Sequence, residues 1–193
     1  MFVSNWKKEI FTIPNLLSLF RLALIPVYMT AYLRAETPGQ YYTAGGILAV
    51  SCLTDAVDGQ IARRCHMIST LGKILDPLAD KITQFTVTLC LSVKYPPLRP
   101  VLILFIVKEL FQLIAGVVHL RRGKMLPGAL MAGKVCTTVL FVSLIFLVLF
   151  PAIPYGTVAV IAVVDTVFLT VSFTGYLLAY FGKHTRVQDL DTE

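Results

Sequence analysis

The sequence predicts an all-α integral membrane protein with six transmembrane helices and a short N-terminal interfacial segment. Of its 193 residues, 56% are hydrophobic and only 15% are charged, and the mean hydropathy is +0.77. Six apolar runs are each long enough to cross a bilayer, and no stretch shows the strict alternation that marks an amphipathic strand. This profile is typical of a chain that exposes its apolar side chains to lipid.

The predicted spans begin and end at polar, charged or turn-forming residues. They cover residues 13–33, 41–62, 71–93, 101–120, 130–150 and 157–181. In the first span, Pro14 stands near the start, where a helix tolerates proline, and Pro26 predicts a kink. A polar link precedes the second span, and the basic pair Arg63 and Arg64 begins the loop to the third.

The remaining boundaries are equally marked. A segment with three prolines, residues 95–100, separates the third span from the fourth, and the basic run 121–124 separates the fourth from the fifth. The turn 151–156 precedes the last span. We therefore expect an N-terminal interfacial amphipathic segment (1–12), a six-helix domain (13–181) and a polar cytoplasmic tail (182–193).

Lysine and arginine residues are distributed unevenly between the two sides of the predicted membrane. Apart from Arg21, Lys81 and Lys108, eleven lie on the side of the N-terminus and three on the other. Because positive loops stay in the cytoplasm, we expect a multi-pass protein of the cell membrane with both termini and the active site facing the cytoplasm. These cytoplasmic lysines and arginines also account for the net charge of +6, so the charge does not indicate a nucleic-acid partner and we expect none. Trp6, Lys7 and Lys8 predict that the first segment lies on anionic membrane lipids.

Four aspartates occupy the facing ends of the second and third spans. Asp55 and Asp58 are three residues apart, and Asp76 and Asp80 are four apart, so each pair shares one face of its helix. A short loop can fold the two helices antiparallel and bring all four carboxylates together. Clustered anions repel one another unless a cation lies between them. We therefore expect a hard divalent cation, Mg²⁺ or Mn²⁺, and four aspartates suffice for two ions.

Two other interpretations of these acids are weaker. Acidic residues at helical spacing usually mark a solvated helix face, but the apolar flanks 44–53 and 82–93 put these acids at a membrane boundary, where ionisable residues are usually functional. A divalent-cation channel or carrier would use them as a filter. Such a pore needs polar positions that continue across the membrane, whereas the outer halves of both spans are apolar.

The residues beside the acids suit a nucleotide. Gly59, Ala62 and Gly72 leave space for a flat nucleotide against the helix backbones, and Arg63 offers a guanidinium to phosphate oxygens. A remaining carboxylate can take the proton of an attacking hydroxyl. The spacing alone therefore predicts metal-assisted transfer of a phosphorylated lipid at the cytoplasmic interface.

The pattern Asp55-x2-Asp58-Gly59-x2-Ala62-Arg63-x8-Gly72-x3-Asp76-x3-Asp80 resembles the full signature of the CDP-alcohol phosphotransferases. The resemblance covers nearly the whole chain, because six helices fit the fold of that family. It implies that Asp55, Asp58 and Asp76 ligate the metal ions, and that Asp80 is both a metal ligand and the catalytic base. It also implies a CDP-lipid site that comprises Asn15, Gly59, Ala62, Arg63, Ser69 and Gly72. The dimers common in this family suggest a homodimer by analogy alone.

Segments 13–21 and 75–81 are similar to those of bacterial phosphatidylglycerophosphate synthases within this family. This similarity implies CDP-diacylglycerol and glycerol 3-phosphate as substrates, with phosphatidylglycerophosphate and CMP as products. The acceptor phosphate would then bind to basic residues of the fourth and fifth spans and their connection, namely Lys108, Arg121, Arg122 and Lys134.

Two departures weaken that acceptor assignment. Lys108-Glu109 stands where those enzymes commonly have Arg-Glu, and Cys136 replaces the second lysine of a Gly-Lys-x-Lys-Thr motif. Cardiolipin synthases, which use phosphatidylglycerol as acceptor, share the Asp-Pro-Leu-Ala-Asp-Lys stretch 76–81 and are the alternative.

Other ionisable residues lie inside the spans. Snorkelling to an interface is one expectation for Arg21 and Lys81. Glu109 is expected to point to a different face from Lys108, and Asp165 is expected to make a local hydrogen bond.

Overall fold

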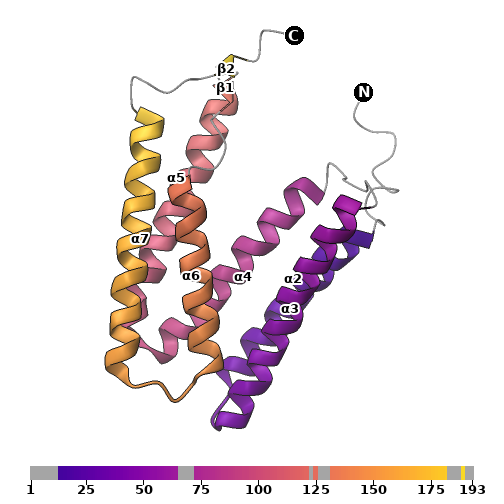
Figure 1. The fold of residues 1–193 in the computed structure, drawn as a ribbon, viewed down its shortest axis with the longest axis vertical. Coiled ribbons are helices and arrows are strands. Elements are labelled where there is room, and N and C mark those ends of the chain that lie inside the picture. The colour runs from indigo at the N-terminus through magenta and orange to yellow at the C-terminus, as the bar shows by residue number, and fades with distance from the viewer. Residues whose placement is uncertain (1–12, 65–71, 122–123, 126–130, 182–187, 190–193) are drawn as a thin grey trace. The chain divides into compact units, whose positions relative to one another are not determined.

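The computed structural model describes residues 13–64, 72–121, 124–125, 131–181 and 188–189 (Figure 1). These residues form six long helices and one short 3-10 turn, in the order α2 (Ile13–Leu33), α3 (Pro38–Arg64), α4 (Gly72–Lys94), η1 (Pro96–Leu98), α5 (Arg99–Arg121), α6 (Met131–Leu149) and α7 (Tyr155–Phe181). Every predicted span is confirmed as a helix, with ends that differ by only a few residues. The all-α fold class is therefore confirmed, while residues 1–12 and most of the tail lie outside the described residues.

One short antiparallel pair was not predicted. The strands β1 (Lys124–Met125) and β2 (Gln188–Asp189) pair Lys124 with Asp189 and Met125 with Gln188. Each strand has two residues, which is too short to produce an alternating pattern in the sequence.

Three helices are long and apolar enough to cross a membrane among the residues described: Asn15–Leu33, Pro96–Val118 and Tyr155–Tyr180. Gly133–Leu149 is a shorter apolar helix. The charged residues of α3 and α4 lower the hydropathy of those two helices. Large apolar side chains also remain exposed along α5, where Ile103, Leu113 and Ile114 are 63–65% exposed, as expected for a surface that faces lipid. The chain is therefore a membrane protein.

The chain divides into two compact units, Met1–Cys90 with Val148–Ala152 and Leu91–Leu147 with Ile153–Glu193. In the first unit, α2 and α3 pack along each other as a hairpin. Tyr32 links the two helices, because its ring lies 5.8 Å from that of Tyr28 on α2 and 5.3 Å from that of Tyr41 on α3. At the turn, the Gln40 side-chain oxygen accepts hydrogen bonds from the backbone N–H groups of Glu36 and Thr37, at 2.7 and 3.1 Å. These contacts fix the hairpin that carries the first part of the candidate site.

In the second unit, α5 packs against α7. The Phe111 ring on α5 makes edge contacts with Phe173 and Tyr180 of α7, at centroid distances of 5.4 and 5.5 Å. The buried apolar residues come from all three helices of this unit and include Val101, Phe105, Leu140, Leu144, Val158 and Leu169.

Candidate active site

Three buried polar residues form a row along α2. Asn15, Ser18 and Arg21 follow one another at intervals of three and are 1%, 0% and 1% exposed. Residues three apart lie on neighbouring turns of the same side of a helix. Buried polar groups require hydrogen-bond partners, and the carboxylates of α3 and α4 supply them to Ser18 and Arg21.

Arg21 joins α3 to α4 through its guanidinium. Its Nη1 donates to Oδ1 of Asp80 at 2.5 Å, and its Nη2 pairs with Oδ1 of Asp55. The Arg21 side chain is 2% exposed, whereas those of Asp55 and Asp80 are 44% and 51% exposed. The snorkelling expected for Arg21 is therefore wrong, because two carboxylates hold the guanidinium in a buried position.

Asp76, the third of the predicted site aspartates whose side chains are described, is also held by α2. The Ser18 hydroxyl donates to Oδ1 of Asp76 at 2.5 Å. Asp76 and Asp80 lie four residues apart on α4, so Ser18 and Arg21 contact the same face of that helix. Asp55, Asp76 and Asp80 thus each contact one side of α2, while the predicted gathering of four carboxylates around metal ions stays a prediction.

Sequence reasoning missed Ser18 and misjudged Arg21. Both belong to an Asn15-x2-Ser18-x2-Arg21 pattern, in which polar residues recur every three positions within an otherwise apolar span. That repeat was the available signal, since polar side chains on one side of a membrane helix face protein rather than lipid.

Several predicted site residues lie outside the described side chains. The backbone of α3 includes residues 58–63 and α4 begins at Gly72, but the side chains of Asp58, Ala62 and Arg63 are not described. Ser69 lies outside the described residues altogether. Their roles in metal and CDP-lipid binding, like those of Gly59 and Gly72, stay predictions.

The described carboxylates suit a hard cation. Within the side chains that the structure describes, no three ligand-type residues gather closely enough to hold a metal ion by themselves. Arg21 pairs with two of the three acids, and Asp58 is not among the described side chains. The donor set is nevertheless all carboxylate, and Asp55 and Asp80 are about half exposed, as oxygen ligands for Mg²⁺ or Mn²⁺ would be. The metal site stays a prediction, and the chemistry of the described carboxylates is compatible with it.

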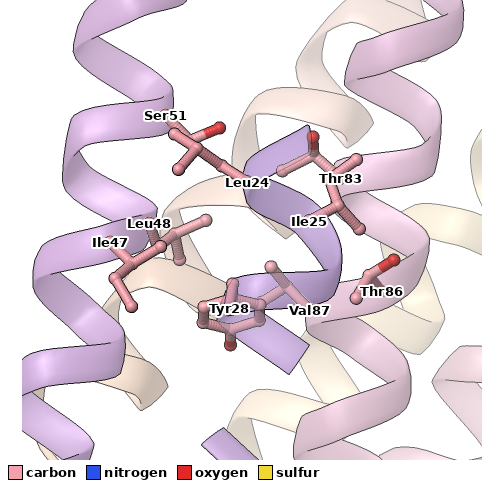
Figure 2. Close-up of a pocket in the computed structure, with 9 residues that line it drawn as sticks. All are labelled: Leu24, Ile25, Tyr28, Ile47, Leu48, Ser51, Thr83, Thr86 and Val87. Carbon is pink, nitrogen blue, oxygen red and sulfur yellow. The ribbon is translucent and has the colours of Figure 1, made fainter. Parts of the chain in front are cut away.

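A small cavity lies one helical turn away from the charged residues, among α2, α3 and α4. Figure 2 shows its lining, in which Leu24, Ser51 and Thr83 are the members nearest in sequence to the charged residues. Its volume is ≈ 10 Å³, about the room of one water molecule. Most of the lining is apolar, so the carboxylate cluster has an apolar boundary on this side.

A larger cavity of ≈ 370 Å³ lies near the turn of the α2–α3 hairpin. Arg34, Gln40 and Thr43 contribute to its lining, which includes no acidic residue among the residues that the structure describes. This cavity lacks groups for metal or acid–base chemistry and is not the candidate active site.

In the second unit, Lys108 is buried and already paired. It is 3% exposed, its Nζ donates to Oε1 of Glu109 at 2.8 Å, and it lies 5.9 Å from the centroid of the Tyr176 ring. This ion pair does not contradict the expectation that Glu109 points to a different face of the helix. Adjacent residues differ by about 100° around a helix, but these two side chains are long enough to meet.

The start of α6 lies against the same tyrosine. A Cβ atom added to Gly133 would be 2.5 Å from the Tyr176 hydroxyl oxygen, so only glycine leaves room for this side chain as it stands. Lys134 follows and is exposed, while the Arg121 side chain and Arg122 lie outside what is described. The grouping of these cations into one anion pocket stays a prediction.

Asp165 lies in the core of the second unit. It is 1% exposed on α7, and neither carboxylate oxygen makes a hydrogen bond of normal geometry to the residues described. The Ser143 side chain of α6 lies near the carboxyl group. The hydrogen bond expected for Asp165 therefore stays a prediction, with Ser143 as its nearest candidate partner on the described part of α6.

Comparison with known proteins adds an independent finding. A family model described as CDP-alcohol phosphatidyltransferase matches residues 11–172. The chain is 33% identical to a cardiolipin synthase (CMP-forming) of Streptomyces coelicolor over 67% of this chain and 61% of that protein. It is 43% identical to the cardiolipin synthase (CMP-forming) of Rattus norvegicus over 57% of this chain and 35% of that protein. It is also 30% identical to a probable phosphatidylglycerophosphate synthase of Mycobacterium tuberculosis over 86% of this chain and 79% of that protein.

Proposed function

The chain belongs to the CDP-alcohol phosphatidyltransferase family, and we propose that it transfers the phosphatidyl group of CDP-diacylglycerol to glycerol 3-phosphate. The products are phosphatidylglycerophosphate and CMP. The observation that carries this proposal is the gathering of Asp55, Asp76 and Asp80 along one side of α2, where Ser18 and Arg21 hold them. A carboxylate cluster at a membrane boundary supports phosphoryl chemistry on a lipid.

We place the reaction at the cytoplasmic face of the cell membrane, among membrane lipids. The excess of lysine and arginine on the side of the N-terminus supports this orientation, because positive loops stay in the cytoplasm. A homodimer is part of the proposal by family analogy.

Each aspartate has a role in the proposed reaction. Asp55, Asp58, Asp76 and Asp80 would hold two Mg²⁺ or Mn²⁺ ions, which neutralise phosphate charge when bound. Asp80 accepts the proton of the acceptor hydroxyl. The hydroxyl oxygen forms a bond to the phosphorus of the phosphatidyl group, and the bond from that phosphorus to the oxygen of CMP breaks. The proton then passes from Asp80 to water.

The neighbouring residues orient the substrates. Arg21 fixes one oxygen of Asp80, and the half-exposed carboxylate can then meet a hydroxyl in one orientation. Asn15, Gly59 and Arg63 bind the CDP group, with Ala62, Ser69 and Gly72 beside them.

The acceptor phosphate binds to cations of the second unit in this proposal. Lys108 lies over the ring of Tyr176, against which Gly133 also packs, and Lys134 follows Gly133 in the chain. Because Glu109 offsets the charge of Lys108, Lys134 with Arg121 or Arg122 must supply most of the attraction for a phosphate dianion.

A second candidate function is cardiolipin synthesis, with phosphatidylglycerol as acceptor. Two relatives that share 33% and 43% identity with this chain carry that name. The Lys108–Glu109 pair also favours this candidate, because a phosphodiester bears one negative charge and needs fewer unpaired cations than a phosphomonoester.

Product analysis tests both candidates. Purified protein is incubated with labelled CDP-diacylglycerol and Mn²⁺, and glycerol 3-phosphate, phosphatidylglycerol, inositol or serine is offered separately. A labelled phosphomonoester lipid from glycerol 3-phosphate supports the proposal. Transfer to phosphatidylglycerol alone supports the second candidate. Mn²⁺ flux into liposomes without release of CMP would instead support a cation carrier.

A further inference from the structure

We infer that Arg21 is a permanent counter-cation of the carboxylate cluster, a positioning residue that stays in place when metal ions bind. It fixes Asp55 and Asp80 from the buried side and weakens the affinity of the cluster for added cations. Its role in turnover rests on the proposed function, whereas its effect on metal affinity does not.

The burial of Arg21 shows that its partners determine its position. An arginine at the centre of a membrane helix costs about 2.5–3.5 kcal/mol on insertion scales, and such residues usually pair within the protein. Arg21 is 1% exposed and contacts Asp55 and Asp80, which lie on two different helices. One side chain therefore ties α2 to both α3 and α4.

The chemistry of the guanidinium allows this bridge. Nη1 contacts Asp80 and Nη2 contacts Asp55, so the two carboxylates are held by two nitrogens of one rigid plane. A lysine would place the same charge on a single nitrogen at the end of a flexible chain. It could balance the charge without fixing the relative orientation of Asp55 and Asp80.

Arg21 is buried, whereas its two partners Asp55 and Asp80 are partly exposed. The guanidinium side is buried, whereas Asp55 and Asp80 are 44% and 51% exposed, and Arg21 contacts Oδ1 of each. Metal ions and the CDP headgroup arrive from water and reach the exposed side. Arg21 can therefore keep both contacts while the cluster is loaded.

This arrangement has two opposite consequences. The positive charge of Arg21 repels metal ions bound to the same carboxylates, so its loss should increase metal affinity. The same loss frees Asp80 to rotate, so turnover should fall. A residue with a merely structural role would instead lower metal affinity, turnover and stability together.

The test uses the full chain in lipid nanodiscs with Arg21→Gln and Arg21→Lys. Binding of Mn²⁺ is measured without substrate by the paramagnetic resonance signal of free Mn²⁺, and kcat and KM are measured separately. For Arg21→Gln we expect Mn²⁺ affinity to rise about three- to tenfold and kcat to fall at least about tenfold. For Arg21→Lys, we expect Mn²⁺ affinity within about twofold of the original, because the charge is kept, and a similar loss in kcat.

Arg34→Gln is the matched control. It removes an exposed arginine just beyond the C-terminal end of α2, about 20 Å along the helix axis from Arg21, and should change neither Mn²⁺ affinity nor kcat. If Arg21→Gln does not fold, Arg21→Lys decides, because full turnover in that variant would overturn the bridging role.

Failure of the inference can be distinguished from failure of the proposed function. Weaker Mn²⁺ binding in Arg21→Gln, together with normal transfer to glycerol 3-phosphate by the original chain, overturns the inference alone. Lack of transfer to glycerol 3-phosphate overturns the function, while the Mn²⁺ titration still tests Arg21. If the original chain binds no Mn²⁺, both the metal site and the inference fail.

Discussion

The hydroxyl of Ser18 on α2 donates to Oδ1 of Asp76 on α4, at 2.5 Å and across 58 positions of the sequence. Through this contact, α2 contributes to the candidate site, because Ser18 orients an aspartate that belongs to a different helix. Together with the two contacts of Arg21, it means that Asp55, Asp76 and Asp80 each have an oxygen held by the first span.

Replacing Ser18 with alanine should weaken metal-dependent activity. A hydrogen bond to a charged group contributes about 1.5–3 kcal/mol, so we expect Ser18→Ala to lower kcat/KM for CDP-diacylglycerol roughly ten- to a hundredfold. Thr30→Ala is the control, because the exposed Thr30 hydroxyl donates only to backbone carbonyls of its own helix. Equal activity of Ser18→Ala and the original chain would show that Asp76 needs no support from α2.

The aspartates should differ in their effect on binding. We predict that Asp80→Asn abolishes transfer but keeps CDP-lipid binding, because a base acts on the acceptor hydroxyl. Asp58→Asn should lose metal and nucleotide together. Calorimetric titration of both variants with CDP-diacylglycerol and Mn²⁺ measures the difference. The same loss of binding in both would leave Asp80 as a metal ligand and remove its role as base.

Lys134→Ala should raise the apparent KM for glycerol 3-phosphate about ten- to a hundredfold, since one charged hydrogen bond is lost. The KM for CDP-diacylglycerol should change little. Steady-state kinetics with each substrate varied separately provides the measurement, and Lys94→Ala, on the opposite predicted side of the membrane, is the control. An unchanged KM for the acceptor would exclude Lys134 from the phosphate site.

Lys108 and Glu109 should contribute to the free energy of unfolding as a pair. Glu109→Gln leaves a buried ammonium without this partner, and breaking a buried ion pair costs up to about 3–5 kcal/mol. Because the Glu109 side chain is 21% exposed, we expect a smaller loss of roughly 1–3 kcal/mol after solvent screening. Thermal unfolding in detergent should show the loss, and the double variant Lys108→Met with Glu109→Gln should recover most of it. If the double variant loses as much stability as the two single variants together, the pairing is contradicted.

The six helices could be predicted from the sequence because each apolar run is bounded by prolines, glycines or charges that act locally. The convergence of Asp76 and Asp80 was predictable for the same reason, since helical periodicity puts both on one face. The position of Arg21 was not. Whether an arginine near a membrane boundary snorkels or pairs depends on how closely α3 and α4 approach α2, and the pattern of one helix does not contain that information.

The contact between Lys108 and Glu109 was missed for a different reason. Helical periodicity describes where Cβ atoms point, whereas long side chains can bend towards each other when burial makes an unpaired charge costly. The strands β1 and β2 were missed because two residues give no period.

The position of Arg21 also constrains how the protein is made. The span Asn15–Leu33 is synthesised before α3 and α4, so Arg21 is made before its partners Asp55 and Asp80. The pair with Asp80 can therefore form only after the third span has been translated, so the final packing of α2 depends on residues that are made after it.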